Sequence, residues 1–505
     1  MLSFAAHANK KPVDTANLAG AHALGSDDVP LRAEITFRDG LIQCSKRAAG
    51  PAGLAILAPV HQFGEVLLET VRLQERAAPY ELTVELARGR LMRINHKLED
   101  WGLLDYPGAE AILEQVSDAK EALIRALQAD SAAEASVPAT EALSLAVRAS
   151  ESLAMFHAES FLARRRQTGG LPKRLLGCGI HLDKSTELAR QRLMAACDFV
   201  TVPFSWRDIE PNEQSFNWKP IDAWVDLLTK NKMPMRGSSL LSFAQRDIPD
   251  WLYVWEHDFD TIRDLAFEHV RRVINRYGQY IQVWDVISGI HAATSFAFNF
   301  EQLMELTRMT AALVKQTFPR ATAIIEIVSP WGEYYARNQR TIPPLLYADM
   351  VMQSGVNFDG FGLKLVFGPA VDGMFVRDLF QISSQLDQFS KLSKPVHITA
   401  AQVPSSMTVD RTLPGGDGQF ALEGGSWHGA WSEAVQAEWL RKFVTIALSK
   451  PFVESLTWAS LADHGKQLVA NGGLLRSDLA PKASYQEWLK LRGELGVGNR
   501  RAERS

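Results

Sequence analysis

The sequence predicts an α/β protein, in which a (β/α)8 TIM barrel follows a small β-rich N-terminal domain and a helical connector. From about residue 175 onward, short apolar runs alternate with helical segments eight times in about 320 residues, which is typical of a TIM barrel with insertions. Twelve of the 13 tryptophans lie between Trp206 and Trp488, and Trp101 alone precedes them. The region before residue 105 shows instead the period of two that is typical of β-strands.

Composition excludes several classes of protein. The 505 residues include 54 basic and 58 acidic side chains, a net charge of −4, so we expect neither nucleic acid nor an anionic membrane as a partner. Cys44, Cys178 and Cys197 are too scattered for a disulfide framework or a zinc site. No signal-peptide core and no uninterrupted run of 18 apolar residues is present, so a cytoplasmic protein is expected. No glycine-rich phosphate loop of the P-loop or Rossmann type is present either, and no cofactor is expected.

The N-terminal part is divided into a tail over residues 1–30 and a β-rich, sandwich-like domain over 31–105. Ile35 and Phe37 alternate with polar neighbours, which predicts a strand. Residues 80–86 alternate in the same way and are also predicted as a strand. We expect this domain to pack on the barrel, to bind a protein partner or to form a homodimer contact.

Residues 106–167 are expected to form the helical connector, because apolar side chains recur there at helical spacing. Its basic end, Arg164 to Arg166, is interpreted as a solvated helix terminus rather than as a binding patch. The barrel is assigned to residues 173–495. Its eight strands are expected near residues 175–180, 199–203, 234–239, 281–286, 323–328, 360–366, 396–400 and 455–458.

Several motifs stand in a fixed order along the predicted barrel. They include W-R-D-I-E-P from Trp206, W-D-V-I from Trp284, D-G-F-G-L from Asp359, I-T at Ile398 and T-W-A-S-L-A-D from Thr457. This series resembles glycoside hydrolase family 10, the xylanase family, over residues of about 175 to 490. The resemblance implies a TIM-barrel protein of carbohydrate metabolism whose site lies at the carboxyl ends of the strands.

The resemblance also implies a retaining mechanism, which needs two carboxyl groups about 5 to 5.5 Å apart. In the family, the acid/base glutamate ends the motif on the fourth strand and the nucleophile follows I-T on the seventh. The matching positions here are Gly289 and Ala400. Neither side chain can donate a proton or attack a sugar carbon, so hydrolysis of xylan by the family mechanism is not expected.

A relocated pair of carboxylates is the alternative, with Glu326 and Asp463 as its candidates. Glu326 ends an apolar run just before Trp331, and burial there is expected to raise its pKa so that it could act as a general acid. A metal cluster of His181, Asp183, His291 and Asp463 is the weaker hypothesis, because no two of these residues stand at a sequence spacing typical of metal ligands. We therefore predict no metal.

Aromatic and polar residues near the predicted strand ends are the candidates for substrate binding. The indoles could stack on sugar rings, but the loop that holds Trp427 and Trp431 could equally plug a cleft that has lost its substrate. The candidates are His291, Trp331, Tyr334, Lys364, Trp427, Trp431 and Trp458.

Three functional hypotheses stay open. The first is a xylanase-like pseudoenzyme that binds a glycan without hydrolysing it. The second is an active glycoside hydrolase that uses Glu326 and Asp463. The third is a structural or interaction protein.

Overall fold

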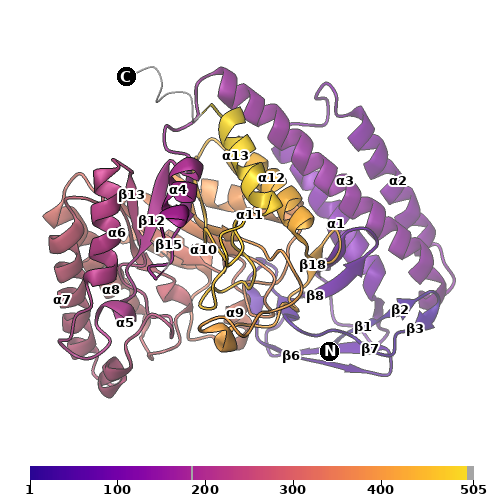
Figure 1. Ribbon diagram of the computed structural model, residues 1–505. Helices are drawn as coiled ribbons and strands as arrows, with labels where there is room; N and C mark the ends of the chain where they lie inside the picture. Colours follow the sequence, from indigo (N-terminus) through magenta and orange to yellow (C-terminus); the bar gives the residue numbers. More distant parts are fainter. Residues whose placement is uncertain (184–185, 497–505) are drawn as a thin grey trace.

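The computed structural model describes residues 1–183 and 186–496. Two parts lie side by side, the barrel in magenta to yellow and the N-terminal part in indigo to violet (Figure 1). No helix in the described ranges is both long and apolar enough to cross a membrane.

Eight parallel strands close into a barrel in chain order, and helices connect them, which confirms the predicted fold class. Every predicted run overlaps one observed strand. The strands are β11 (Leu176–Gly179), β12 (Phe199–Pro203), β13 (Met235–Ser238), β14 (Val283–Ser288), β15 (Thr322–Val328), β16 (Gly360–Val366), β17 (Val396–Gln402) and β19 (Val453–Trp458).

Helices surround the barrel because their apolar faces pack on its strands, and short 3-10 turns lie in the loops. The helices are α4 (Glu187–Ala196), α5 (Trp206–Ile209), α6 (Lys219–Lys230), α7 (Phe259–Tyr277), α8 (Phe300–Thr317), α9 (Glu333–Arg337), α10 (Pro344–Gln353), α11 (Leu379–Ser390), α12 (Glu433–Ser449) and α13 (Ala483–Glu494). The turns are η1 (Asp250–Trp255), η2 (Ile290–Ala292) and η3 (Gly416–Gly418).

The N-terminal part holds a four-stranded sheet of order β10-β1-β7-β6 and a five-stranded sheet of order β18-β9-β8-β4-β5. Their strands are β1 (Leu2–Ala5), β4 (His22–Leu24), β5 (Pro30–Leu31), β6 (Ala33–Arg38), β7 (Leu41–Lys46), β8 (Gly53–Val60), β9 (Gly64–Glu69), β10 (Tyr80–Glu81) and β18 (Ser426–Trp427), with a hairpin of β2 (His7–Ala8) and β3 (Lys11–Pro12) beside them. The expected tail over residues 1–30 is therefore wrong as secondary structure. Leu2 and Phe4 are buried, and β1 pairs with β7 along its whole length.

The predicted strand over residues 80–86 is also wrong. Only Tyr80 and Glu81 form a strand, and helix α1 (Leu82–Asp100) begins directly after them. The Glu81 carboxylate accepts a hydrogen bond of 2.8 Å from the Val84 N–H and caps the helix. The alternation misled because this helix buries Val84, Glu85, Leu86 and Ala87 in succession, so no exposed face reveals its period.

Two further helices, α2 (Glu110–Leu127) and α3 (Ala132–Gln167), complete the connector. The basic end of α3 is not simply a solvated terminus. Arg165 is buried, and its guanidinium donates to the carbonyls of Gly170, Leu448, Lys450 and Val453 at 2.7 to 3.0 Å. This arginine therefore fastens the helix to the barrel where α12 leads into β19.

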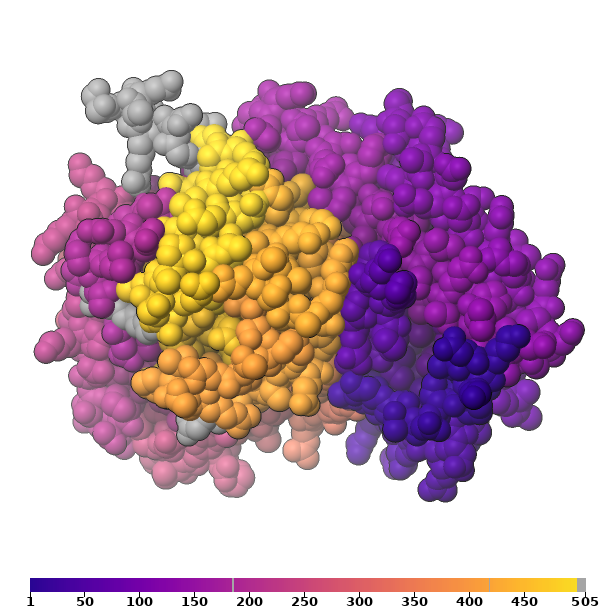
Figure 2. All heavy atoms as spheres, turned by 45° about the vertical axis from the view of Figure 1, so that its right-hand side comes forward, coloured from indigo at the N-terminus to yellow at the C-terminus, as the bar shows by residue number. Residues whose placement is uncertain are grey.

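The two parts of the chain share one continuous core. Strand β18, in the loop between β17 and α12, pairs antiparallel with β9 of the N-terminal sheet. The Leu67 N–H donates to the Val376 carbonyl at 2.9 Å, and the Arg337 guanidinium donates to the Ala21 carbonyl at 2.9 Å. The N-terminal sheet therefore packs on the loops that follow β15, β16 and β17, and Figure 2 shows indigo and orange surfaces in direct contact.

Candidate functional site

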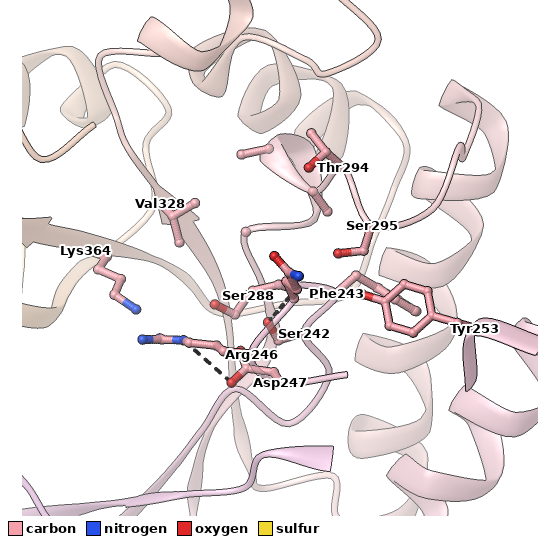
Figure 3. A pocket seen from close by; sticks show the side chains of 15 residues that line it. Ser242, Phe243, Arg246, Asp247, Tyr253, Ser288, Thr294, Ser295, Val328 and Lys364 are labelled. Carbon is pink, nitrogen blue, oxygen red and sulfur yellow. Dashed lines mark hydrogen bonds and ion pairs between the residues drawn. The ribbon is translucent and has the colours of Figure 1, made fainter. Parts of the chain in front are cut away.

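A pocket of about 410 Å³ opens at the carboxyl ends of β13, β14, β15 and β16, on the part of the barrel mouth that the N-terminal sheet leaves uncovered. Figure 3 shows its polar side chains converging from these strand ends and the loops after them. The lining residues are Ser242, Phe243, Ala244, Gln245, Arg246, Asp247, Tyr253, Ser288, Gly289, Ala292, Ala293, Thr294, Ser295, Val328 and Lys364.

Glu326 lies behind this lining. Its carboxylate is 5% exposed and accepts a hydrogen bond from the Ser288 hydroxyl, which stands opposite it in the β14–β15 pair. Burial favours a raised pKa, but the Lys364 ammonium, the Ser288 and Thr399 hydroxyls and the Arg236 guanidinium together outweigh burial, and the pKa of Glu326 lies below its ordinary value of 4.5. The expected raised pKa is thus wrong, because several groups that stabilise the anion surround it.

A buried ion pair lies deeper in the barrel. Arg236 of β13 donates from Nε to both carboxylate oxygens of Asp285 on β14, at 2.9 and 3.1 Å, and a second guanidinium nitrogen also bonds this carboxylate. Burial raises the pKa of Asp285 to about 6, although Arg236 opposes that shift. Both side chains are almost fully buried, so the pair supports the barrel from within and does not reach the pocket.

Two cationic side chains face each other across the pocket. Lys364 extends from β16 and Arg246 from the loop after β13, and their charged ends point toward one another (Figure 3). The Asp247 carboxylate lies 3.7 Å from Nε of Arg246. The Lys364 ammonium forms no hydrogen bond or ion pair with any residue in the ranges 1–183 and 186–496.

The backbone at position 289 disfavours any side chain. Gly289 has a φ of +59°, in the left-handed region, and a Cβ added there would lie 2.9 Å from Cγ2 of Val328. The glycine also donates its N–H to the Glu326 carbonyl at 3.1 Å. Ala400, at the position that matches the family's nucleophile, lies in β17 opposite Lys364 of β16.

Three predicted sugar platforms are buried. Trp427 is 0% exposed and donates its indole N–H to Glu151 at 2.8 Å, because β18 is drawn into the N-terminal sheet. Trp431 donates to the Gly425 carbonyl at 3.1 Å, and Trp458 is fully enclosed in β19. Of the two interpretations of the loop at Trp427, the burial agrees with the plug.

The other predicted binding residues have structural partners as well. Tyr334 donates to the Ile342 carbonyl at 2.7 Å, and Trp331 packs against Phe367. His291 is fully buried, and burial lowers its pKa to about 4. Of the seven predicted binding residues, Lys364 alone lines the pocket.

Asp463, in the loop after β19, has structural partners of its own. It forms an ion pair of 2.7 Å with Lys482 and accepts a hydrogen bond of 2.8 Å from the Gly473 N–H. It does not line the pocket. Within the described residues, no three His, Cys, Asp or Glu side chains gather as a metal site requires, so the hypothetical metal cluster does not form.

The sequence interpretation missed most of the pocket. Arg246, Asp247, Tyr253, Thr294 and Ser295 belong to loops that have no regular period. Their positions shortly after the third and fourth strands were the only available signal, since site residues of TIM barrels lie in those loops.

A closed eight-stranded barrel with a polar pocket at its strand ends belongs to the broad class of TIM-barrel proteins, whose functional sites lie at those ends. The profile of Glycosyl hydrolase family 10 matches residues 182–487, more than half of the chain, and the chain belongs to this family. Its barrel is thus xylanase-like in sequence.

Known relatives share modest identity with this chain. An endo-1,4-beta-xylanase/feruloyl esterase from Xylanibacter ruminicola is 21% identical over 303 residues, which cover 55% of this chain and 40% of the relative. Endo-1,4-beta-xylanase B from Thermotoga neapolitana is 21% identical over 261 residues, or 51% and 67% of the two chains. The structure of native xylanase 10B from Thermotoga maritima covers 67% of this chain and 98% of its own, with 17% identity and a TM-score of 0.48.

Proposed function

We propose that this protein binds a carbohydrate at the barrel mouth and does not hydrolyse it by the two-glutamate mechanism of its family. The observation that carries the proposal is the composition of the pocket, whose single acidic lining residue, Asp247, lies beside Arg246. Retaining hydrolysis needs two opposed carboxyl groups, one of which must carry a proton.

The state of Glu326 supports the same proposal. A general acid must be protonated near neutral pH, but the environment of Glu326 lowers its pKa and so favours the anion. Asp463 is committed to Lys482 by an ion pair. Neither residue of the alternative catalytic pair therefore has the surroundings of a proton donor.

The shape of the mouth supports binding of a short ligand. The N-terminal sheet covers the loops after β15, β16 and β17, and the pocket is confined to the ends of β13 to β16 and the loops after β13 and β14. Its volume of about 410 Å³ lies in the range of small-molecule sites. We therefore propose a short saccharide or a chain end as the ligand.

The test combines binding and turnover. The full-length protein is titrated with xylotriose by calorimetry, and release of reducing ends from xylan and xylotriose is followed over days, with an active xylanase as positive control. We expect binding without release. Turnover that is abolished by Glu326→Gln, in a variant that unfolds at the wild-type temperature, would instead establish the active hydrolase of the alternative hypothesis.

A further inference from the structure

The pocket contains two cations that form no hydrogen bond with any side chain of the described residues, although Glu326, Asp247 and Asp285 favour the charged form of Lys364. Lys364 comes from β16 and Arg246 from the loop after β13, and their charged ends converge in Figure 3. Two like charges at close range in a partly enclosed site repel one another, and an anion between them removes that repulsion. Arg246 accordingly contributes to the lowered pKa of Lys364, after the larger effect of burial.

The acidic groups around these cations are already engaged. From the loop after β13, Asp247 faces Nε of Arg246, on one edge of the guanidinium. Glu326 of β15 accepts a hydrogen bond from the Ser288 hydroxyl and lies behind the residues that line the pocket. The remaining edge of the guanidinium and the Lys364 ammonium therefore have donor capacity that no side chain of the described residues uses.

The rest of the lining suits a sugar. Thr294 and Ser295 bring hydroxyl groups to one side of the pocket, and Figure 3 shows the Tyr253 ring beside them. Hydroxyls match the donors and acceptors of a pyranose, and an aromatic face packs on its C–H groups. A sugar seated there would place a substituent within reach of the two cations.

We infer that the pocket binds an acidic sugar, a hexuronate, whose carboxylate lies between the Lys364 ammonium and the Arg246 guanidinium. A planar carboxylate fits the forked donors of arginine in a bidentate manner, and the lysine adds a point charge. This inference rests on the proposed function, because it assumes a carbohydrate ligand, and it specifies the chemical class of that ligand.

The experiment titrates the full-length protein with D-glucuronic acid, D-glucose, D-glucose 6-phosphate and neutral xylotriose by calorimetry. The variants are Lys364→Met and Arg246→Gln. Lys230→Met, at the end of α6 that leads to the amino-terminal side of β13, is the matched control. Arg246 lies on an exposed loop, so its variant is expected to fold even if a substitution in β16 disturbs the barrel, and thermal unfolding checks both.

We expect glucuronate to bind at least about ten-fold more tightly than glucose, and each pocket variant to weaken glucuronate binding about ten-fold, the effect of losing one charge-assisted hydrogen bond. The control variant is expected to bind as the wild type does. Added salt should weaken glucuronate binding and leave xylotriose binding unchanged.

Other outcomes would overturn the inference in distinguishable ways. Equal affinity for glucose and glucuronate, unaffected by either pocket variant, would overturn it. Binding of xylotriose without binding of glucuronate would do the same and would leave the proposed function standing. Tighter binding of glucose 6-phosphate, lost in the same variants, would replace the carboxylate by a phosphate. Failure of every sugar to bind would overturn both proposals.

Discussion

The Ser288 hydroxyl donates a hydrogen bond to the Glu326 carboxylate across the β14–β15 pair. Ser288 stands one residue before Gly289, the position at which family resemblance places the acid/base glutamate. The buried Glu326 carboxylate thus lies at the barrel mouth, and the Ser288 hydroxyl and the Lys364 ammonium stabilise its charged form. The surroundings of Glu326 therefore favour its anionic form.

Replacement of Ser288 by alanine is expected to destabilise the fold by about 1.5 to 3 kcal/mol at pH 7, because a buried carboxylate loses a hydrogen bond. Folding lowers the pKa of Glu326 below 4.5, so its anionic form stabilises the fold above that pH. The difference between wild type and variant should shrink as the pH falls below 4.5. Urea unfolding at several pH values measures it, with Ser295→Ala as control. Equal stabilities at pH 7 would contradict the prediction.

Restoring glutamate at positions 289 and 400 is expected not to restore xylan hydrolysis. Gly289 has a left-handed φ, and any Cβ there meets Val328, so Gly289→Glu should be displaced and destabilised by on the order of 1 to 3 kcal/mol. Thermal unfolding and reducing-end release measure the two effects in the double variant Gly289→Glu/Ala400→Glu. Gly289→Ala isolates the backbone contribution. Turnover in the double variant would show that the strand ends still have the geometry of an active family member.

His397 is expected to make the protein less stable in acid. Burial lowers its pKa from 6.5 to about 3, so the unfolded chain binds a proton there that the folded chain excludes. Its contribution to stability is present above pH 6.5 and is lost as the pH falls toward 3, by about 1.4 kcal/mol per pH unit. His397→Gln should reduce the slope of stability against pH in that window. His257→Gln, at a side chain that is 93% exposed, should leave the slope unchanged; an unchanged slope in His397→Gln would contradict the prediction.

Arg165→Met is expected to destabilise the protein by on the order of 3 kcal/mol. The guanidinium donates to four backbone carbonyls, three of which belong to the barrel, and their loss leaves buried acceptors without partners. Arg164→Met, one residue earlier on the exposed side of α3, is the control and should stay within about 0.5 kcal/mol of wild type. Chemical denaturation followed by tryptophan fluorescence compares them. Similar losses in both variants would refute the role of Arg165 as a fastening residue.

Trp427→Phe is expected to lower stability by about 1 to 3 kcal/mol, because Glu151 loses a buried hydrogen-bond donor. Binding of xylotriose should remain at the wild-type affinity, since Trp427 lies outside the pocket lining. Trp255→Phe, at a side chain that is 36% exposed, is the control for stability. Weaker sugar binding at unchanged stability would restore the platform hypothesis.

The barrel could be predicted because each of its strands is a short apolar run between helical segments. The region around residues 80–86 could not, because a helix that is buried on most sides and a strand that alternates have similar local patterns until the cap at Glu81 is seen. The sequence was equally compatible with Trp427 and Trp431 as exposed sugar platforms and as buried residues of a plug. Pairing of β18 with β9 brings together segments more than 350 residues apart, and no local pattern reports such a contact.

Local composition and motif order were thus sufficient to predict the barrel and the ends of its strands, and to identify the residues at positions 289 and 400 as glycine and alanine instead of glutamate. Buried faces of helices and strands produce periodic patterns of apolar residues in the sequence, and the residue at each motif position can be read directly from the sequence. The protonation preference of Glu326 and the convergence of Arg246 with Lys364 depended on folding. Electrostatic interactions act through distance in space, and barrel closure brings together charges from strands that are remote in the chain.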